Sequence, residues 1–170
     1  METAFSARIT AALDHASLLC ARTGGKLTPL RRQVLGLILE SPAPVGAYDL
    51  LSQLRTNHAA SAPPTIYRAL EFLREHGLVH RIERLAAFIG CVDAEPHDHQ
   101  AQFLICRTCN RVTELDDHHL AHALTDAAQR LGFTVSGATI EAEGLCAACG
   151  AKEASAGALP QTPPGPGPGP

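Results

Sequence analysis

Cysteine and histidine are the residues of this chain most able to do chemistry, and their spacing indicates metal binding. Cys106 and Cys109 form one C-x-x-C pair, and Cys146 and Cys149 form a second pair after 36 intervening residues. Two such pairs can give four thiolates to a tetrahedral zinc ion, the usual geometry of a closed structural site. In a reducing compartment, paired C-x-x-C motifs indicate metal binding before disulfides. The spacing therefore predicts a structural zinc site.

A second group of donors lies upstream of the first pair. Cys91, His97 and His99 cannot join a site that four thiolates already close, so they suggest a second metal. We therefore expect one metal that holds a domain together and another that makes it respond to the cell. Cys20 belongs to neither group, because it falls on an apolar helical stripe where free cysteine is commonly buried.

The composition fits one or two small domains. The chain has 170 residues and is 45% hydrophobic, which is enough for ordinary cores. It has no signal peptide and no apolar run of about 18 residues, so we expect a soluble, cytoplasmic protein without a membrane segment. Residues 1–90 carry 10 Lys and Arg against 7 Asp and Glu, whereas residues 91–170 carry 4 against 10. The first half is therefore suited to phosphate and the second to cations.

Hydrophobic periodicity predicts helices followed by a two-stranded ribbon in the first half. The helices are expected over residues 3–22, 28–40, 47–55 and 65–76, and the strands over 78–83 and 87–91. Thr28 and Pro29 fit the N-cap and first turn of the second helix, and Gly77 fits the C′ position of the fourth. Helices followed by a ribbon are the pattern of a winged helix-turn-helix domain.

The fourth helix is the natural DNA reader of such a domain. Its buried face is expected to consist of Ile66, Ala69, Leu70 and Leu73. Thr65, Tyr67 and Arg68 then face outward near its N-terminus, where a recognition helix meets the groove and the phosphates. Arginine can read guanine bidentately or bind phosphate. Glu71 and Glu75 also face outward and fit an ordinary solvated surface, so the pattern alone leaves DNA binding open.

The second half predicts a small α/β domain. Its order is β-β-α-β with a metal hook at each end, and it includes strands over residues 112–115 and 134–141 and a helix over 117–131. So small a domain buries too little area to be very stable alone, so zinc and dimerisation would both help it. From Ala154 onward the chain is mostly Ala, Gly and Pro, which predicts a disordered Pro/Gly tail over 154–170.

The string P-P-T-I-Y-R-A-L-E-F-L-R-E-H-G-L-V-H, followed by Cys91, H-D-H and the two C-x-x-C pairs, resembles the ferric uptake regulator family of metal-sensing repressors. The resemblance is greatest to its zinc uptake regulator branch and runs from about residue 5 to residue 150. It implies an α+β chain with a winged-helix DNA-binding domain over residues 1–90. It also implies a metal-binding dimerisation domain over 91–153 and a hinge at about 84–100.

The resemblance also implies roles for individual residues. It assigns a structural zinc to Cys106, Cys109, Cys146 and Cys149, and a regulatory zinc to His80, Cys91, His99 and Glu114. It assigns DNA contacts to Tyr67 and Arg68, with Arg31 in the T-P-x-R opening of the second helix, and Thr65 joins them through its outward position. The implied protein is a homodimer with two zinc ions per chain that represses zinc uptake genes by binding a palindromic operator in double-stranded DNA.

The chemistry of the mixed ligand set agrees with sensing rather than catalysis. One Cys, two His and one Glu fill all four positions around zinc, so no water remains to attack a substrate, and we expect no enzyme. Thiolate also favours zinc over a hard metal. Because His80 follows the reading helix and Glu114 belongs to the second half, one ion would tie the two domains together. It would select the geometry that spaces two reading helices for DNA.

Several alternatives stay open at this point. Within the family the chain could sense iron or another divalent metal. Outside it, a zinc enzyme using Cys91 with a histidine, or a purely structural zinc module, is possible from the residue types. Asp98 or His97 could replace Glu114 as a ligand. His118, His119 and His122 crowd one helix and fit a solvated face or a weaker third metal site.

Overall fold

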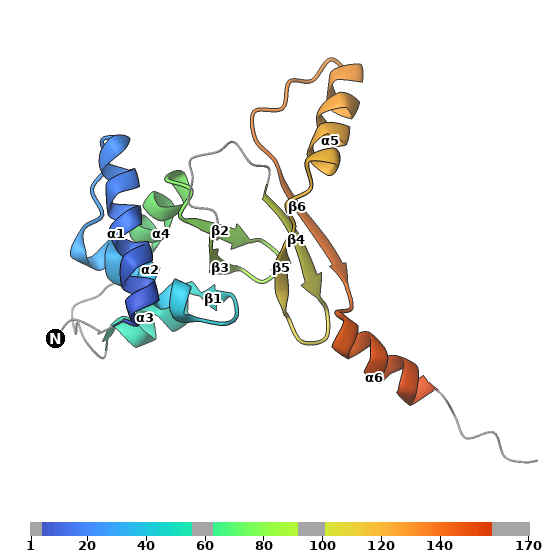
Figure 1. Ribbon diagram of the computed structural model, residues 1–170, viewed down its shortest axis with the longest axis horizontal. Helices are drawn as coiled ribbons and strands as arrows, with labels where there is room; N and C mark the ends of the chain where they lie inside the picture. The colour runs from blue at the N-terminus through green and yellow to red at the C-terminus, as the bar shows by residue number, and fades with distance from the viewer. Residues whose placement is uncertain (1–4, 56–62, 92–100, 158–170) are drawn as a thin grey trace, which may run out of the picture.

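The computed structural model describes residues 5–55, 63–91 and 101–157, and its elements follow one another in an α+β order (Figure 1). The first half contains α1 (Ala7–Arg22), α2 (Pro29–Glu40), β1 (Val45–Gly46), α3 (Ala47–Arg55), α4 (Pro63–Glu75), β2 (Val79–Ile82) and β3 (Ala87–Gly90). The second contains β4 (Ala101–Cys106), β5 (Val112–Glu114), α5 (His118–Arg130), β6 (Thr139–Gly144) and α6 (Ala147–Gly157). The predicted fold class is confirmed.

Local sequence signals set the ends of several helices. The Ser6 hydroxyl accepts a hydrogen bond from the Ile9 amide at 3.4 Å, so α1 begins at Ala7 rather than at residue 3. Thr28 and Pro29 begin α2 as predicted.

Gly77 ends α4 with a φ of +66°, and the Leu78 amide donates back to the Leu73 carbonyl at 2.9 Å. A residue in the left-handed region, usually glycine, commonly ends a helix in this way.

The four helices of the first half pack on a small antiparallel sheet to form the winged helix-turn-helix. The strand order is β1-β3-β2, with Val45 opposite Phe88 and Val79 opposite Gly90. The core between helices and sheet includes Leu13, Val34, Leu35, Leu50, Leu54, Ile66, Leu70 and Leu73. The two-residue β1 was not predicted, because Val45 and Gly46 are too few residues to show an alternation.

A second sheet organises the other half, with strand order β5-β4-β6. β4 is antiparallel to β5 and parallel to β6, so α5 is the crossover that returns the chain for parallel pairing. The sequence predicted the last strand over residues 134–141, but β6 spans Thr139–Gly144. Pairing with β4 fixes that register, because Ala101 lies opposite Thr139 and Cys106 opposite Gly144. The prediction was wrong because local β-propensity carries no information about a partner strand.

An apolar cluster joins the two sheets. Ile82 at the end of β2 is fully buried against Phe103 and Ile105 of β4, and Leu85, Ile89 and Val112 pack around them. The ribbon of β2 and β3 therefore lies against the second sheet, as Figure 1 shows.

The far end of the chain differs from its prediction. The Pro/Gly tail was expected to begin at Ala154, but α6 continues to Gly157 because its Ala-rich sequence favours helix. Residues 158–170 lie outside the described residues. No helix in the described part of the chain is both long and apolar enough to cross a bilayer.

The left-handed backbone at Gly77 generates the first prediction. A Cβ added there would meet no atom within 4 Å, so Gly77→Ala costs only the backbone strain of a positive φ. We expect a loss of about 1 kcal/mol in the free energy of unfolding, measured by urea denaturation followed by circular dichroism. Gly137→Ala is the matched control, because Gly137 also has open space but no positive φ. Equal stability of both variants would contradict this explanation of how α4 ends.

Candidate metal centres and DNA-reading helix

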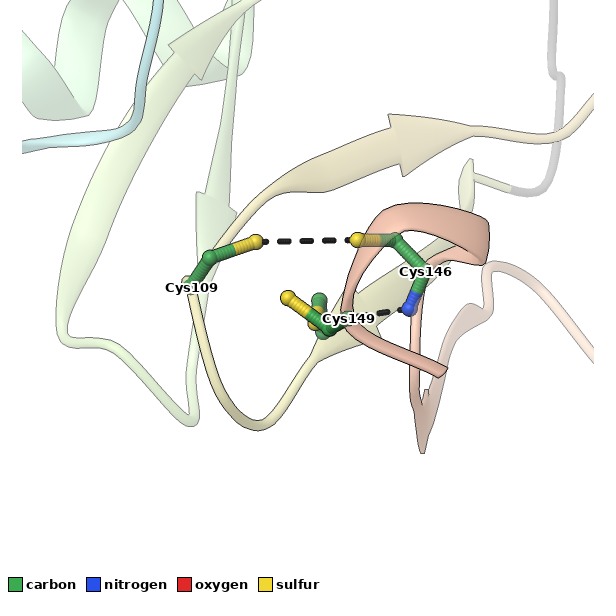
Figure 2. A group of neighbouring side chains, drawn as sticks. Cys109, Cys146 and Cys149 are labelled. Atoms are coloured by element: carbon green, nitrogen blue, oxygen red, sulfur yellow. Dashed lines mark hydrogen bonds between the residues drawn. The ribbon is translucent and has the colours of Figure 1, made fainter. Parts of the chain in front are cut away.

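The four cysteines of the two C-x-x-C pairs come together at one end of the second sheet. Their sulfur atoms all lie within 4.8 Å of one another, and the Sγ atoms of Cys109 and Cys146 are 3.8 Å apart. In Figure 2 the thiols of Cys109, Cys146 and Cys149 point toward a common centre. A tetrahedral zinc ion with Zn–S bonds of about 2.3 Å places its sulfurs about 3.8 Å apart. The spacing of these thiols therefore fits zinc.

Backbone geometry presents the four thiols. The first hook is the turn between β4 and β5, where Asn110 has a φ of 55° and its amide donates to the Cys106 carbonyl at 2.9 Å. Asparagine tolerates that conformation better than most residues. The second hook runs into the first turn of α6, where the Gly150 amide donates to the Cys146 carbonyl at 2.8 Å. Because β4 and β6 are parallel, the two hooks follow the carboxyl ends of neighbouring strands and lie at the same end of the sheet.

Electrostatics show that these thiols suit a dication. Backbone amides, first that of Cys146 at 3.4 Å, hold the pKa of Cys106 down at about 6. The Cys149 amide lowers the pKa of Cys146 in the same way. The neighbouring sulfurs, first that of Cys146, raise the pKa of Cys149 to about 12. Four adjacent thiols cannot all ionise by themselves, whereas a divalent cation would offset half of the charge of four thiolates and favour their deprotonation by binding each sulfur.

A second group of donors lies where the ribbon meets the second sheet. His80 comes from β2, Cys91 follows β3, and Glu114 ends β5, and their ligand atoms lie within 4.8 Å of one another. His80 Nε2 is 3.8 Å from Glu114 Oε1, and the Cys91 side chain is only 6% exposed. The His80 ring also lies against Phe103, with 5.4 Å between ring centroids. We call this group the junction trio.

The other predicted metal ligands have different positions. His99, His97 and Asp98 lie outside the described residues, so the fourth ligand of the junction trio stays a prediction. His118, His119 and His122 are exposed on α5. Within the described ranges they do not join any group of three or more donors as close as the two above.

The outward face of α4 carries three of the four predicted DNA contacts. Thr65, Tyr67 and Arg68 are all exposed, and Tyr67 retains 49% of its surface. Arg31 lies differently, because its guanidinium stacks on Phe72 at 3.5 Å from the ring centroid and donates to the Lys26 carbonyl at 2.8 Å. These contacts hold Arg31 at the opposite end of α4 from Thr65.

Tyr48 lies in the helix that the sequence predicted over residues 47–55, and no role was predicted for it. The structure exposes 74% of this side chain at the start of α3, the helix before the predicted reader. A tyrosine is amphipathic, so its type does not reveal whether it packs inward or faces solvent. Its exposure makes it a further candidate for contact with DNA, on the helix that precedes α4.

Comparison with known proteins agrees with this architecture. The model of the ferric uptake regulator family matches residues 22–143. The zinc uptake regulation protein of Escherichia coli (strain K12) is 37% identical over 137 residues, which are 81% of this chain and 80% of that protein. A structure of a zinc uptake regulator complexed with zinc and DNA gives a TM-score of 0.81 at 36% identity, covering 86% of this chain and 97% of that one. The crystal structure of holo XcZur gives 0.76 at 40% identity, covering 83% and 98%.

The chain therefore belongs to the ferric uptake regulator family, a family of transcription regulators and not of enzymes. Within that family it resembles the zinc uptake regulators, as its sequence indicated.

The four-thiol site generates the second prediction. Cys106→Ser removes the thiol whose ionisation the backbone favours most, so the chain should lose one tightly held zinc and either misfold or become monomeric. Metal content per chain and sedimentation velocity would measure this. Cys20→Ala is the control, because Cys20 is fully buried in the winged-helix core, away from both metal groups. A Cys106→Ser protein that remains a well-folded dimer with its full zinc content would contradict the structural assignment.

Proposed function

We propose that this protein is a zinc-responsive repressor that binds operator DNA as a homodimer and controls zinc uptake genes. The junction trio is the observation that carries the proposal. Two of its donors belong to the ribbon of the winged helix and the third belongs to the second sheet. A cation held there joins the part that reads DNA to the part that pairs with a second copy.

His80, Cys91 and Glu114 would hold the regulatory zinc, with His99 as the expected fourth ligand. A zinc ion is coordinated by several ligands at once, and the fold of this chain fixes the positions of those ligands. Cys91 is anchored because its amide donates to the Leu78 carbonyl at 3.1 Å. Glu114 is fixed by the pairing of β5 with β4, where it lies opposite Phe103. The ion therefore favours one arrangement of ribbon and sheet over others.

Cys106, Cys109, Cys146 and Cys149 would hold a second, structural zinc. Four thiolates close the coordination shell and should retain the ion more firmly than the mixed set does. We therefore propose two zinc ions per chain when zinc is abundant, and one after mild chelation.

The homodimer would form through residues 91–153, and α5 supports this. No residue of α5 is buried in the single chain, although the helix has an apolar stripe. Leu120 and Leu124 on that stripe are 38% and 37% exposed, and Leu131 and Phe133 just beyond it are 86% and 67% exposed. Such an apolar surface is typical of an interface, and a second copy offers the same surface for a symmetric contact.

The winged helix, residues 1–90, would bind the DNA. Thr65, Tyr67 and Arg68 face outward at the start of α4, and the dimer would present two such helices to a palindromic operator. Arg31 would contribute only if it left its stacking contact with Phe72. Because a repressor must meet its DNA, we place the protein in the cytoplasm.

An iron or other divalent-metal sensor is the alternative within the family. The presence of a cysteine in the junction trio favours zinc, since thiolate is a soft ligand and hard metals prefer oxygen. Competition between zinc and ferrous iron for the site, followed by DNA binding, would decide between them.

Arg68 carries the third prediction. Arg68→Ala should weaken operator binding while zinc content and dimerisation stay unchanged, because the side chain is exposed at the start of α4. Loss of a base contact would cost about 1–3 kcal/mol and relax specificity at one position. The operator would first be selected from a random duplex pool with zinc-loaded protein.

Lys152→Ala is the control, since Lys152 is an exposed basic residue of α6, outside the winged helix and outside α5. If Arg68 instead contacts a phosphate, its loss would weaken binding to all sequences alike. It would also reduce the slope of log affinity against log salt concentration by about 1. Unchanged affinity for both operator and random DNA would remove Arg68 from the interface.

Cys91 carries the fourth prediction, which tests the proposed function. In a gel-shift assay, zinc should raise the affinity of the parent protein for the operator by a factor of roughly 5–150. Cys91→Ser should keep the structural zinc, the fold and the dimer but lose that stimulation, because a serine hydroxyl resists deprotonation at neutral pH. High zinc should restore part of it through the remaining ligands. His15→Ala is the control, as this histidine is exposed on α1 outside both groups. Full stimulation in Cys91→Ser would place the sensing site elsewhere.

A further inference from the structure

The face of the second sheet that meets the ribbon is built from two rows of side chains. Strand pairing places Glu114, Phe103 and Glu141 side by side across β5, β4 and β6, and Val112, Ile105 and Glu143 form the next row. Side chains two residues apart on a strand share one face, so both rows face the same way. Apolar residues occupy the centre, and a carboxylate stands on each outer strand of the first row.

β2 crosses this face from one outer strand to the other. At one side His80 lies against Glu114 of β5, with 3.8 Å between Nε2 and Oε1. In the middle Ile82 is buried against Phe103 and Ile105 of β4. On the other side the turn that follows β2 meets β6. The ribbon therefore contacts both outer strands of the second sheet, β5 and β6. Only the contact with β5 belongs to the junction trio.

The second attachment is a set of polar contacts that we call the wing-tip clasp, made by Glu83, Arg84, Glu141 and Glu143. The Glu83 amide donates to Glu141 Oε1 at 2.7 Å, and the Arg84 amide donates to Glu141 Oε2 at 3.2 Å. Arg84 Nε lies 3.0 Å from Glu143 Oε1. Both oxygens of one carboxylate are thus used on the turn, and the next carboxylate on the same face binds its arginine.

These contacts use strong partners. A carboxylate that accepts from backbone amides is bound more firmly than a neutral acceptor. The Arg84–Glu143 pair is partly exposed, at 39% and 49% of the two side chains, so alone it contributes little. The clasp gains its direction from geometry, since three interactions fix the turn relative to β6.

We propose that the wing-tip clasp is a second, metal-independent positioning site that sets the angle of the DNA-reading head. This inference rests on the proposed function. A ribbon held at the junction trio alone could rotate about that point, whereas attachment at two separated points fixes its direction. Glu141, Glu143 and Arg84 are therefore positioning residues for DNA binding, and zinc closes a junction whose other side is already held.

The angle between the ribbon and the second sheet affects how the dimer meets DNA. In a homodimer the two second sheets are fixed to each other, so the angle between ribbon and sheet sets the separation of the two α4 helices. Half-sites for helix-turn-helix dimers are about 34–36 Å apart, or a multiple of that distance. A small rotation at the clasp moves each reading helix away from its half-site without touching a metal ligand or a DNA contact.

The positioning role of the wing-tip clasp can be tested by measuring operator binding with zinc-loaded, full-length protein and the selected operator. Glu141→Ala should weaken operator binding about 3- to 30-fold and, separately, Glu143→Ala about 2- to 5-fold, with zinc content, dimerisation and melting temperature close to those of the parent. Amide hydrogen exchange should accelerate at residues 83–84 in Glu141→Ala. Glu153→Ala is the matched control, because it breaks an exposed ion pair with Arg107, 3.4 Å long, within the second half.

A charge exchange separates positioning from direct DNA contact by Arg84. Arg84→Glu should weaken binding, and adding Glu143→Arg should recover most of the lost affinity. A phosphate contact by Arg84 would not recover, and that result would overturn the positioning role of Arg84. If Glu141→Ala fails to fold, Glu143→Ala and the charge exchange still decide the question.

The two proposals fail in different ways. A parent protein that shows no zinc-dependent operator binding would refute the proposed function, while the exchange measurement would still report whether the clasp forms. A parent that binds normally, together with Glu141→Ala and Glu143→Ala proteins within twofold of it, would overturn the clasp alone.

Discussion

The packing of the ribbon across the second sheet is the constraint on which the rest of this structure depends. β2 is an edge strand of the first sheet, yet its Ile82 completes an apolar layer with Phe103 and Ile105 of β4 in the second sheet. That burial brings His80 of the first half within 3.8 Å of Glu114 of the second half. The same packing brings the turn after β2 to the carboxylates of β6.

The two candidate metal centres differ in what they connect. The four thiols link two hooks at one edge of a single sheet, so an ion there stabilises a domain that buries little area of its own. The junction trio links the ribbon of the first sheet to β5 of the second sheet, so an ion there would act on the arrangement of the two sheets rather than on the fold of either. Ligand chemistry agrees with this division, because a closed thiolate shell favours permanence and a mixed set favours exchange.

Much of this could be predicted from the sequence because the relevant signals are local. The spacing of Cys106, Cys109, Cys146 and Cys149 predicted four neighbouring thiols, and Gly77 predicted the end of α4. What depends on distant pairing could not be predicted. β6 was misplaced by several residues because its register is set by β4, and α6 was not predicted because an Ala- and Gly-rich segment suits both helix and tail. Glu141 and Glu143 resemble ordinary solvated acids until strand order places them beside Arg84, which is 57 residues from Glu141.

Thermodynamic linkage gives the most direct test of the central claim that zinc at the junction trio and DNA at α4 act on one arrangement. Zinc affinity of the mixed site would be measured by competition with a chelator, with and without the selected operator. We predict that operator tightens zinc binding by the same factor by which zinc tightens operator binding, roughly 5–150-fold. Identical zinc affinity in the presence and absence of bound operator would contradict the account.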